Sequence, residues 1–131
     1  MATLFTKIVN GEIPCYKVAE SDDFLAFLDI QPLTKGHVLV IPKIEVDYIF
    51  DLEDDLLAKM IVFSKCVSHK IKTIYPCKKI GVTVIGLEVP HAHIHLVPIN
   101  TMSDMNFSNS KLNLDASELT EIANNISNIS K

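Results

Sequence analysis

The chain has 131 residues, of which 48% are hydrophobic and 21% are charged, and its formal net charge is −4. This length suits one domain, residues 1–131, with enough core to fold without disulfides. The composition is that of a globular chain and excludes a disordered or fibrous one. Because proteins that hold nucleic acid usually present a basic surface, the acidic balance argues against nucleic acid as a partner.

Cysteine usage and hydropathy indicate the compartment. The three cysteines, Cys15, Cys66 and Cys77, are odd in number and widely spaced, which favours neither a disulfide framework nor a zinc-binding pair. The N-terminal segment soon reaches Lys7 and Glu12 and lacks a secretory apolar stretch. No run approaches the ~18 apolar residues of a membrane span. We therefore expect a cytoplasmic protein that does not enter the membrane.

The first part of the chain predicts a short helix followed by strands. Residues 4–9 are apolar and basic, and Asn10-Gly11 is a helix stop signal. Apolar and β-branched runs separated by turn residues predict the strands that follow. The expected strands are Tyr16–Ala19, Phe24–Leu28 and His37–Ile41, with turns at residues 21–23 and 32–36.

The second part combines a long helix with two strands. Apolar residues recur every three or four positions from Asp51 to Tyr75, which predicts an amphipathic helix with Asp51 as its N-cap. We expect strands over Ile80–Ile85 and Ala92–Pro98, a loop over 101–113, and a final helix from a capping box at Asp115 to about Ile126. The fold class is therefore α+β, with about five mainly antiparallel strands, one long helix and short terminal helices.

Three of the five histidines stand at alternate positions, in His91-Ala92-His93-Ile94-His95. In a strand, residues two apart point to the same face and lie roughly 6.5 Å from each other. This spacing predicts a row of three imidazoles on one face, while the apolar residues between them anchor the strand to the core.

Three interpretations of this row compete. The first is a polar strand face with no chemical role. The second is a zinc site, because a His-x-His pair with a third ligand can activate water, although only Glu88 is a nearby acid. The third is nucleophilic and acid–base chemistry, in which a neutral imidazole attacks phosphorus and its neighbours hold the phosphate oxygens and protonate the leaving group. Three histidines in register favour the third interpretation.

At these residues the sequence resembles the histidine triad (HIT) superfamily. His91–Val97 is similar to the His-φ-His-φ-His-φ-φ signature, where φ is an apolar residue. Three earlier segments resemble the Hint-like branch in order and spacing: 5–14, 27–32 and 36–43. The resemblance covers roughly residues 4–98, leaving a C-terminal loop and helix over 99–131, and it implies a HIT-like fold.

The resemblance also implies roles for the histidines. His93 is expected to be the nucleophile that carries the nucleotidyl group. His91 and His95 are expected to bind phosphate oxygens and orient His93. His37 matches the family's fourth histidine, which joins the same hydrogen-bond network, although an ordinary histidine at the start of a strand is the simpler alternative.

A nucleotide pocket is implied in the same way. Asp29 matches the acid that binds the ribose hydroxyls, and Phe5, Ile8, Phe27 and Ile30 match the apolar pocket around the base. The alternatives are that Phe27 and Ile30 are ordinary core residues and that Asp29 only shapes a turn. No cofactor is implied.

The sequence departs from the family pattern at two places. Residues 86–90, Gly-Leu-Glu-Val-Pro, replace the Gly-Gln-Ser/Thr run that many members carry before the triad, so the groups that would contact the phosphate or leaving group are missing. Some relatives hold a structural zinc with N-terminal cysteines and a further histidine. Thr3, Thr6 and Glu45 are poor substitutes for those ligands, so we predict no metal.

The expected function is hydrolysis of nucleoside 5′-phosphoramidates or related purine, AMP-like nucleotides through a nucleotidyl-His93 intermediate. Two alternatives stay open: hydrolysis of dinucleoside polyphosphates, as in the Fhit-like branch, and a nucleotide-binding regulatory module with little turnover. The family also implies a homodimer that uses the long helix and a sheet edge.

Overall fold

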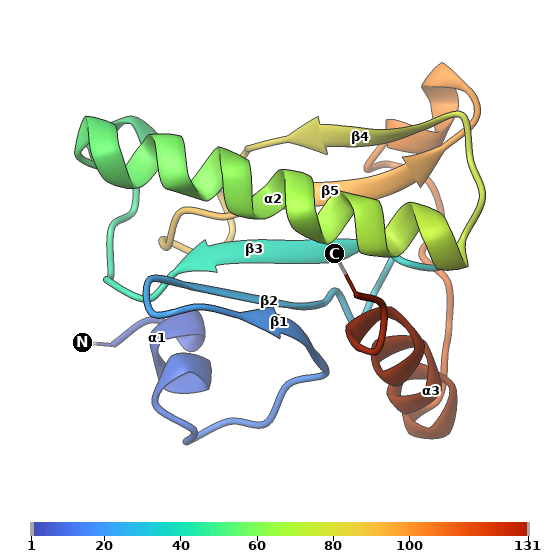
Figure 1. The fold of residues 1–131 in the computed structure, drawn as a ribbon, viewed down its shortest axis with the longest axis horizontal. Coiled ribbons are helices and arrows are strands. Elements are labelled where there is room, and N and C mark those ends of the chain that lie inside the picture. Colours follow the sequence, from blue (N-terminus) through green and yellow to red (C-terminus); the bar gives the residue numbers. More distant parts are fainter. Residues whose placement is uncertain (1, 131) are drawn as a thin grey trace.

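The computed structural model describes residues 2–130 and contains one antiparallel sheet. Its five strands lie in the spatial order β1-β2-β3-β5-β4 (Figure 1). The expected α+β class with a five-stranded antiparallel sheet is confirmed. The strands are β1 (Lys17–Glu20), β2 (Phe24–Leu28), β3 (Val38–Pro42), β4 (Lys79–Thr83) and β5 (Ile94–Ile99).

One long helix and two short ones accompany the sheet. In Figure 1 α2 runs the length of one sheet face, and α3 lies beside it near β1. Within residues 2–130, no helix combines the length and the apolar character needed to cross a membrane. The helices are α1 (Leu4–Val9), α2 (Asp54–Ile74) and α3 (Ala116–Ser127), with short 3-10 helices at Ile49–Asp51 and Met102–Met105.

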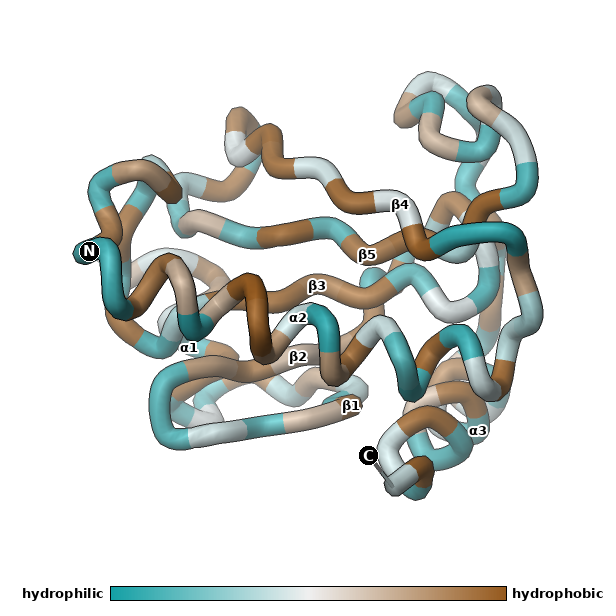
Figure 2. The backbone as a smooth tube through the Cα atoms, turned by 45° about the horizontal axis from the view of Figure 1, so that its top comes forward, coloured by the Kyte–Doolittle hydropathy of each residue, from teal (hydrophilic) through white to brown (hydrophobic). Residues whose placement is uncertain are grey.

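Both faces of the central strands are buried. Along β2, Phe24, Ala26 and Leu28 belong to a core shared with α2 and α3, which we call the helix-side core. Leu25 and Phe27 belong to a second, smaller core on the other face, together with Phe5 of α1. This alternation follows from the period of two in a strand. Figure 2 shows the resulting continuous hydrophobic colour along the central strands.

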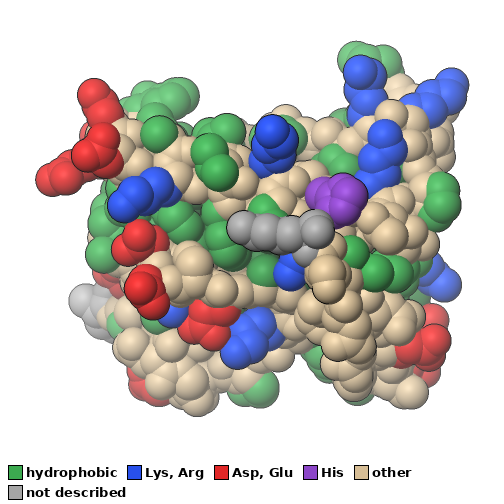
Figure 3. Space-filling view, viewed as in Figure 1, with side chains coloured by type: hydrophobic (Ala, Val, Ile, Leu, Met, Phe, Trp, Pro, Cys, Tyr) green, Lys and Arg blue, Asp and Glu red, His purple; other side chains and the backbone are tan. Residues whose placement is uncertain are grey.

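Helix α2 packs its apolar side against the sheet and carries opposite charges at its two ends. Met60, Val67 and Ile71 are fully buried on its inner side. Acidic residues occupy its first turn and Lys72 its last turn, an arrangement that complements the helix dipole. Figure 3 shows acidic and basic side chains gathered at opposite ends of this face of the molecule.

The start of α2 differs from the prediction. The helix begins at Asp54, and Asp51 is not its N-cap, since Glu53 holds that position without a side-chain hydrogen bond. Asp51 instead ends the 3-10 helix, because the chain makes an extra turn there to bury Ile49 and Leu52 in the helix-side core. The other α-helices and the strands lie within two residues of their predicted bounds, whereas the 3-10 helix Met102–Met105 lies in the segment that was predicted as a loop.

Gly36 makes the tight turn that leads into His37 and β3. Its φ of +94° lies in the region that favours glycine. A Cβ added there would lie 2.9 Å from Cδ2 of Tyr75 and 3.2 Å from Cγ of Pro98. Gly11 has a similar φ of +78°, but a Cβ there would meet nothing within 4 Å.

This contrast predicts different costs for two alanine substitutions. Gly11→Ala introduces only backbone strain, so it lowers the free energy of unfolding by about 1 kcal/mol. Gly36→Ala adds a clash in a packed region and lowers it by about 2–4 kcal/mol. Urea unfolding of the two variants measures the difference. Equal losses would contradict the close packing around the turn before His37.

Candidate active site

The histidine segment approaches the sheet before it becomes a strand. β5 begins at Ile94, two residues later than predicted, because the Ala92 amide donates to the Val46 carbonyl at 2.7 Å rather than to a neighbouring strand. Ala92, Ile94 and Leu96 nevertheless lie in the helix-side core, as their alternation indicates. The intervening histidines are therefore directed away from that core.

Three imidazoles form one contiguous cluster. The ring centroids of His93 and His95 are 5.0 Å apart, and those of His95 and His37 are 5.2 Å apart. His37 Nε2 lies 3.0 Å from His95 Nδ1, which is hydrogen-bond distance. His37, from the turn before β3, thus contacts His95, which lies 58 positions later in the chain, and His95 in turn contacts His93.

The structure does not bring the His91 ring into this cluster. Its Nδ1 lies 2.9 Å from Thr3 Oγ1 and its Nε2 lies 2.9 Å from the Pro42 carbonyl oxygen, and the residue is fully buried. The prediction of one row of three rings is wrong here, because residue 91 precedes the strand in which alternate residues share a face. His91 offers its backbone instead, since its carbonyl oxygen lies 2.7 Å from His93 Nδ1.

The hydrogen bonds assign a tautomer to each ring of the cluster. A carbonyl oxygen can only accept, so His93 Nδ1 carries the proton and its Nε2 keeps a free lone pair. The Leu33 amide donates to His37 Nδ1 at 3.0 Å, so His37 Nε2 carries the proton and donates to His95 Nδ1. His95 therefore carries its proton on Nε2. An acceptor nitrogen on His93 stands beside a donor nitrogen on His95.

Both of these Nε2 atoms reach the surface. Neither makes a hydrogen bond within residues 2–130, and within that range no fully buried side-chain nitrogen or oxygen lacks a partner. His93 and His95 are only slightly exposed as whole residues. The two Nε2 atoms therefore keep a small contact with solvent.

Burial keeps two of these histidines neutral. Desolvation, assisted by His95 and Lys111, lowers the pKa of His37 to about 3. Desolvation, assisted by His93, lowers the pKa of His95 to about 4. Both rings are neutral at physiological pH, in agreement with the tautomers that the hydrogen bonds require. The cluster therefore presents N–H donors and a lone pair rather than positive charges.

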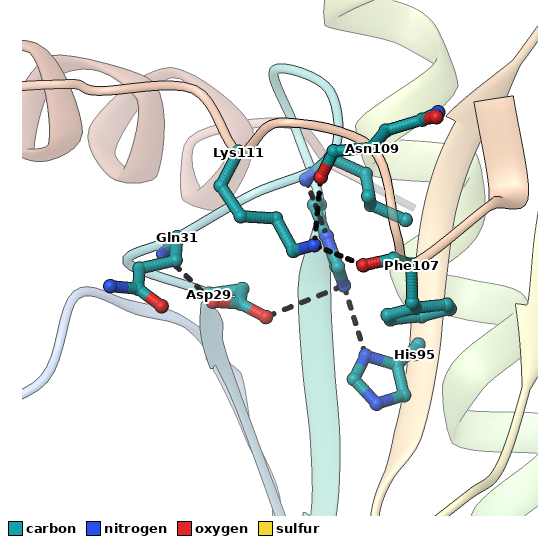
Figure 4. Close-up of polar contacts among 8 residues, drawn as sticks. Asp29, Gln31, His95, Phe107, Asn109 and Lys111 are labelled. Carbon is teal, nitrogen blue, oxygen red and sulfur yellow. Dashed lines mark hydrogen bonds and ion pairs between the residues drawn. The ribbon is translucent and has the colours of Figure 1, made fainter.

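Asp29 lies at the edge of the cluster. Figure 4 shows its carboxylate beside Gln31. One oxygen accepts from the Gln31 amide at 2.8 Å, and the other lies 3.6 Å from His37 Nε2. Burial raises the pKa of Asp29, and the Gln31 hydrogen bond opposes that rise. Within residues 2–130 the second oxygen accepts no hydrogen bond.

Two residues of the C-terminal loop complete the cluster, and sequence reasoning missed both. The ring of Phe107 packs at 4.9 Å from that of His95, and the ammonium of Lys111 donates to the carbonyls of Phe107 and Asn109 (Figure 4). The positive charge of Lys111 lowers the pKa of both Asp29 and His37. The polar, aperiodic loop gave no signal that it returns to the histidines.

An apolar pocket of about 260 Å³ opens beside the cluster. Small-molecule sites range from about 300 to 1,000 Å³, so this pocket lies near the lower end of that range and suits a compact ligand group. Phe5 joins pocket and cluster, because its ring lies 5.0 Å from that of His93 and 5.5 Å from that of Phe27. All five residues predicted for nucleotide binding line it: Phe5, Ile8, Phe27, Asp29 and Ile30.

The exposure of the pocket residues tests the alternative that Phe27 and Ile30 are ordinary core residues. Phe5 and Phe27 are almost fully buried and also belong to the second core. Ile30 is 62% exposed, so it is not a core residue and instead forms the outer rim of the pocket.

Among residues 2–130, one group of side chains is a candidate position for a metal ion. Asp29, His37 and His95 each offer a ligand atom, and these atoms lie within 4.8 Å of one another. The same atoms already form the hydrogen bond and the close carboxylate contact described above, which satisfy them without a metal. That no metal is needed stays a prediction.

Comparisons with known proteins point to one family. Residues 10–102 match the model of the HIT domain. Over 95% of both chains, the sequence is 36% identical to an uncharacterized HIT-like protein from Borreliella burgdorferi. It is 39% identical to an adenosine 5′-monophosphoramidase from Schizosaccharomyces pombe, over 75% of this chain and 74% of that protein.

A solved structure agrees with the fold. The crystal structure of a HIT-like protein from Bartonella henselae superimposes with a TM-score of 0.82 and 28% identity. The match covers 95% of this chain and 94% of that one.

The lowered pKa values predict a stability that depends on pH. The unfolded chain binds protons on His37 and His95 below about pH 6.5, whereas the folded chain resists protonation until about pH 3–4. Stability is therefore full above pH 6.5 and is lost as the pH falls from there. Each histidine removes about 2 kcal/mol between pH 7 and pH 5.

Urea unfolding at pH 7 and pH 5 measures this loss, and the variant His37→Gln provides the comparison. Glutamine keeps a donor toward His95 but does not titrate, so the variant should lose less stability over the same interval. An unfolding free energy of the parent that does not fall between these pH values would show that the rings are not held neutral.

Proposed function

The chain belongs to the HIT domain family, and on that premise we propose that it hydrolyses nucleoside 5′-phosphoramidates or related AMP derivatives through a nucleotidyl intermediate on His93. The observation that carries the proposal is the hydrogen bond from His93 Nδ1 to the His91 carbonyl, which leaves the Nε2 lone pair free. The relative from Schizosaccharomyces pombe, named for this activity, supports it.

The pocket supports a nucleoside as the bound group. The base lies between the apolar side chains of Phe5, Ile8, Phe27 and Ile30, which exclude water from its faces. The free oxygen of Asp29 accepts from the ribose hydroxyls. Because Phe5 also contacts His93, a nucleoside in this pocket directs its 5′-phosphate toward the nucleophile.

The reaction then proceeds in two displacements. His93 Nε2 attacks phosphorus, the bond to the amine breaks, and the amine leaves with a proton taken from solvent. His95 Nε2–H donates to a phosphate oxygen, and the His91 carbonyl stabilises the proton on the now positive His93 ring. Water next attacks phosphorus, the electron pair returns to Nε2, AMP leaves, and the proton of the water passes to solvent.

Substrate choice is the finer part of the proposal. The segment 86–90 carries Glu88 in place of amide and hydroxyl groups, and a carboxylate there disfavours a long anionic leaving group. This favours a phosphoramidate over a dinucleoside polyphosphate. The same change supports the second candidate function, a nucleotide-binding module with little turnover.

Release of AMP from adenosine 5′-phosphoramidate and from a diadenosine polyphosphate tests these alternatives. The parent should prefer the phosphoramidate, and His93→Ala should lower its turnover by about a thousandfold or more, since it removes the nucleophile. His69→Ala, at an exposed histidine of α2, is the matched control and should keep parental turnover. Equal turnover in His93→Ala and the parent would exclude the mechanism, whereas AMP binding without turnover would favour the regulatory module.

We also propose that the protein is a homodimer. β4 forms one edge of the sheet and presents exposed Val82. Val84, just after β4, lies around the same groove as Ile61 of α2 and Phe50. An exposed apolar edge strand is a surface that proteins usually cover. A second copy of the chain, placed edge to edge, covers it.

Light scattering should give twice the chain mass of 14.6 kDa for the parent. Val82→Lys places a charge on the β4 edge and should shift the protein to the monomer. Met102→Lys is the control, because Met102 is 93% exposed and lies outside that groove. A monomeric parent, or a Val82→Lys variant that stays dimeric, would contradict this interface.

A further inference from the structure

Behind His91, on the side away from the cluster, four residues from three parts of the chain form a compact hydrogen-bond network. Thr3 precedes α1, Thr6 lies within α1, and Glu45 follows β3. The Glu45 carboxylate lies 2.9 Å from the Thr3 amide and 2.7 Å from the Thr6 hydroxyl. The Thr3 hydroxyl lies 2.9 Å from His91 Nδ1. We call Thr3, Thr6, Glu45 and His91 the threonine network.

The chemistry of the partners fixes where each proton lies. A carboxylate only accepts, so the Thr6 hydroxyl donates to Glu45 and its proton is not available to His91. The Pro42 carbonyl only accepts, so His91 donates from Nε2 and its Nδ1 is an acceptor. The Thr3 hydroxyl therefore donates to His91 Nδ1 while accepting from the Thr6 amide. The Thr3 hydroxyl also lies 3.2 Å from the Thr6 hydroxyl, and the shorter distance of 2.9 Å to His91 Nδ1 assigns its proton to His91.

The charge state of Glu45 agrees with this arrangement. The Thr3 amide and then the Thr6 hydroxyl lower the pKa of this carboxyl, although the side chain lies at the surface. An ionised Glu45 therefore orients the Thr6 hydroxyl and holds Thr3 through its backbone amide.

The threonine network fixes the peptide group between His91 and Ala92, whose carbonyl oxygen accepts the hydrogen bond from His93. The His91 ring is fixed at both nitrogens, and its backbone amide donates to the Val89 carbonyl at 2.8 Å. The next amide, of Ala92, donates to Val46 at 2.7 Å. The carbonyl between these fixed points is the acceptor for His93 Nδ1.

We propose that Thr3, Thr6 and Glu45 are positioning residues for the reaction, which hold His91 so that its carbonyl keeps His93 in the tautomer with a free Nε2. The inference rests on the proposed function for its catalytic consequence. The network also links the nucleophile to the pocket, because Thr3 is the N-cap of α1, which carries Phe5 and Ile8.

A matched pair of substitutions at Thr3 separates this role from helix capping. Serine and aspartate both cap helices well, so Thr3→Ser and Thr3→Asp each preserve α1. Serine keeps the donor to His91 Nδ1, whereas an aspartate carboxylate only accepts and opposes the lone pair there. Glu45→Ala removes the end of the network, and Glu12→Ala, at an exposed carboxylate of the following turn, is its control.

Nitrogen-15 NMR of the histidine rings reads the tautomer directly and needs no activity. The parent, Thr3→Ser and Glu12→Ala should show His93 protonated on Nδ1 only, and Thr3→Asp and Glu45→Ala should show a mixture. A single tautomer in all five proteins would overturn the proposal. If Thr3→Asp and Glu45→Ala shift the tautomer as expected but the parent shows no turnover, the positioning role of the network stands and the proposed function fails.

Kinetics gives the second readout. Full loss of the correct tautomer in a catalytic histidine costs about 10⁴ in kcat, so a partial loss should lower kcat by about tenfold in Thr3→Asp and Glu45→Ala. KM should stay within about twofold, because the pocket is intact. Thr3→Ser should retain parental kcat. A KM that rises while kcat is unchanged would assign the network to pocket structure and contradict the positioning role.

Discussion

The hydrogen bond from His93 Nδ1 to the His91 carbonyl is the contact on which the chemistry of this fold depends. At 2.7 Å it is short, and it fixes both the rotation of the ring and the position of its proton. With the proton on Nδ1, the lone pair lies on Nε2, the atom that meets solvent beside His95. If the proton moved to Nε2, the same ring in the same place would have no nucleophile to offer.

This constraint explains why a histidine occupies position 91 although its ring faces away from the cluster. The ring is a structural anchor between α1 and the end of β3, and the backbone is the functional part. The core supports the arrangement from the other side, because Ala92 and Ile94 are buried against the helix-side core. The site is therefore held by backbone on one face and by packing on the other.

Burial rather than charge prepares the cluster. His37 and His95 are kept neutral by desolvation, and the hydrogen bond from His37 leaves the Nε2–H of His95 free for the phosphate oxygen that the proposed function requires. Lys111, on the C-terminal loop, brings a positive charge near Asp29 and His37 and lowers the pKa of both. A local charge of this kind is what the proposed binding of a phosphate compound by an acidic chain requires.

Hydrophobic periodicity predicted the buried faces of those segments whose backbone is regular. The alternation in β2 and at Ala92, Ile94 and Leu96 predicted which residues face the core. The pocket residues were predicted from the family resemblance of four ordered sequence segments, not from periodicity. The direction of the His91 ring could not be predicted, because face alternation assumes an extended strand and residue 91 precedes it. Phe107 and Lys111 were missed because nothing local in a polar loop encodes a contact with residues 37 and 95. The start of α2 was misplaced because the burial of Ile49 and Leu52 outweighs a good capping residue at Asp51.

The attachment point of phosphorus on the trapped intermediate tests the central claim most directly. In protein labelled with nitrogen-15 in its histidines and quenched during turnover of a nucleoside phosphoramidate, phosphorus-31 NMR should show coupling to one ring nitrogen, Nε2 of His93, and mass spectrometry should place the nucleotidyl group on that residue. Attachment through Nδ1, or to His37, His91 or His95, would contradict the account.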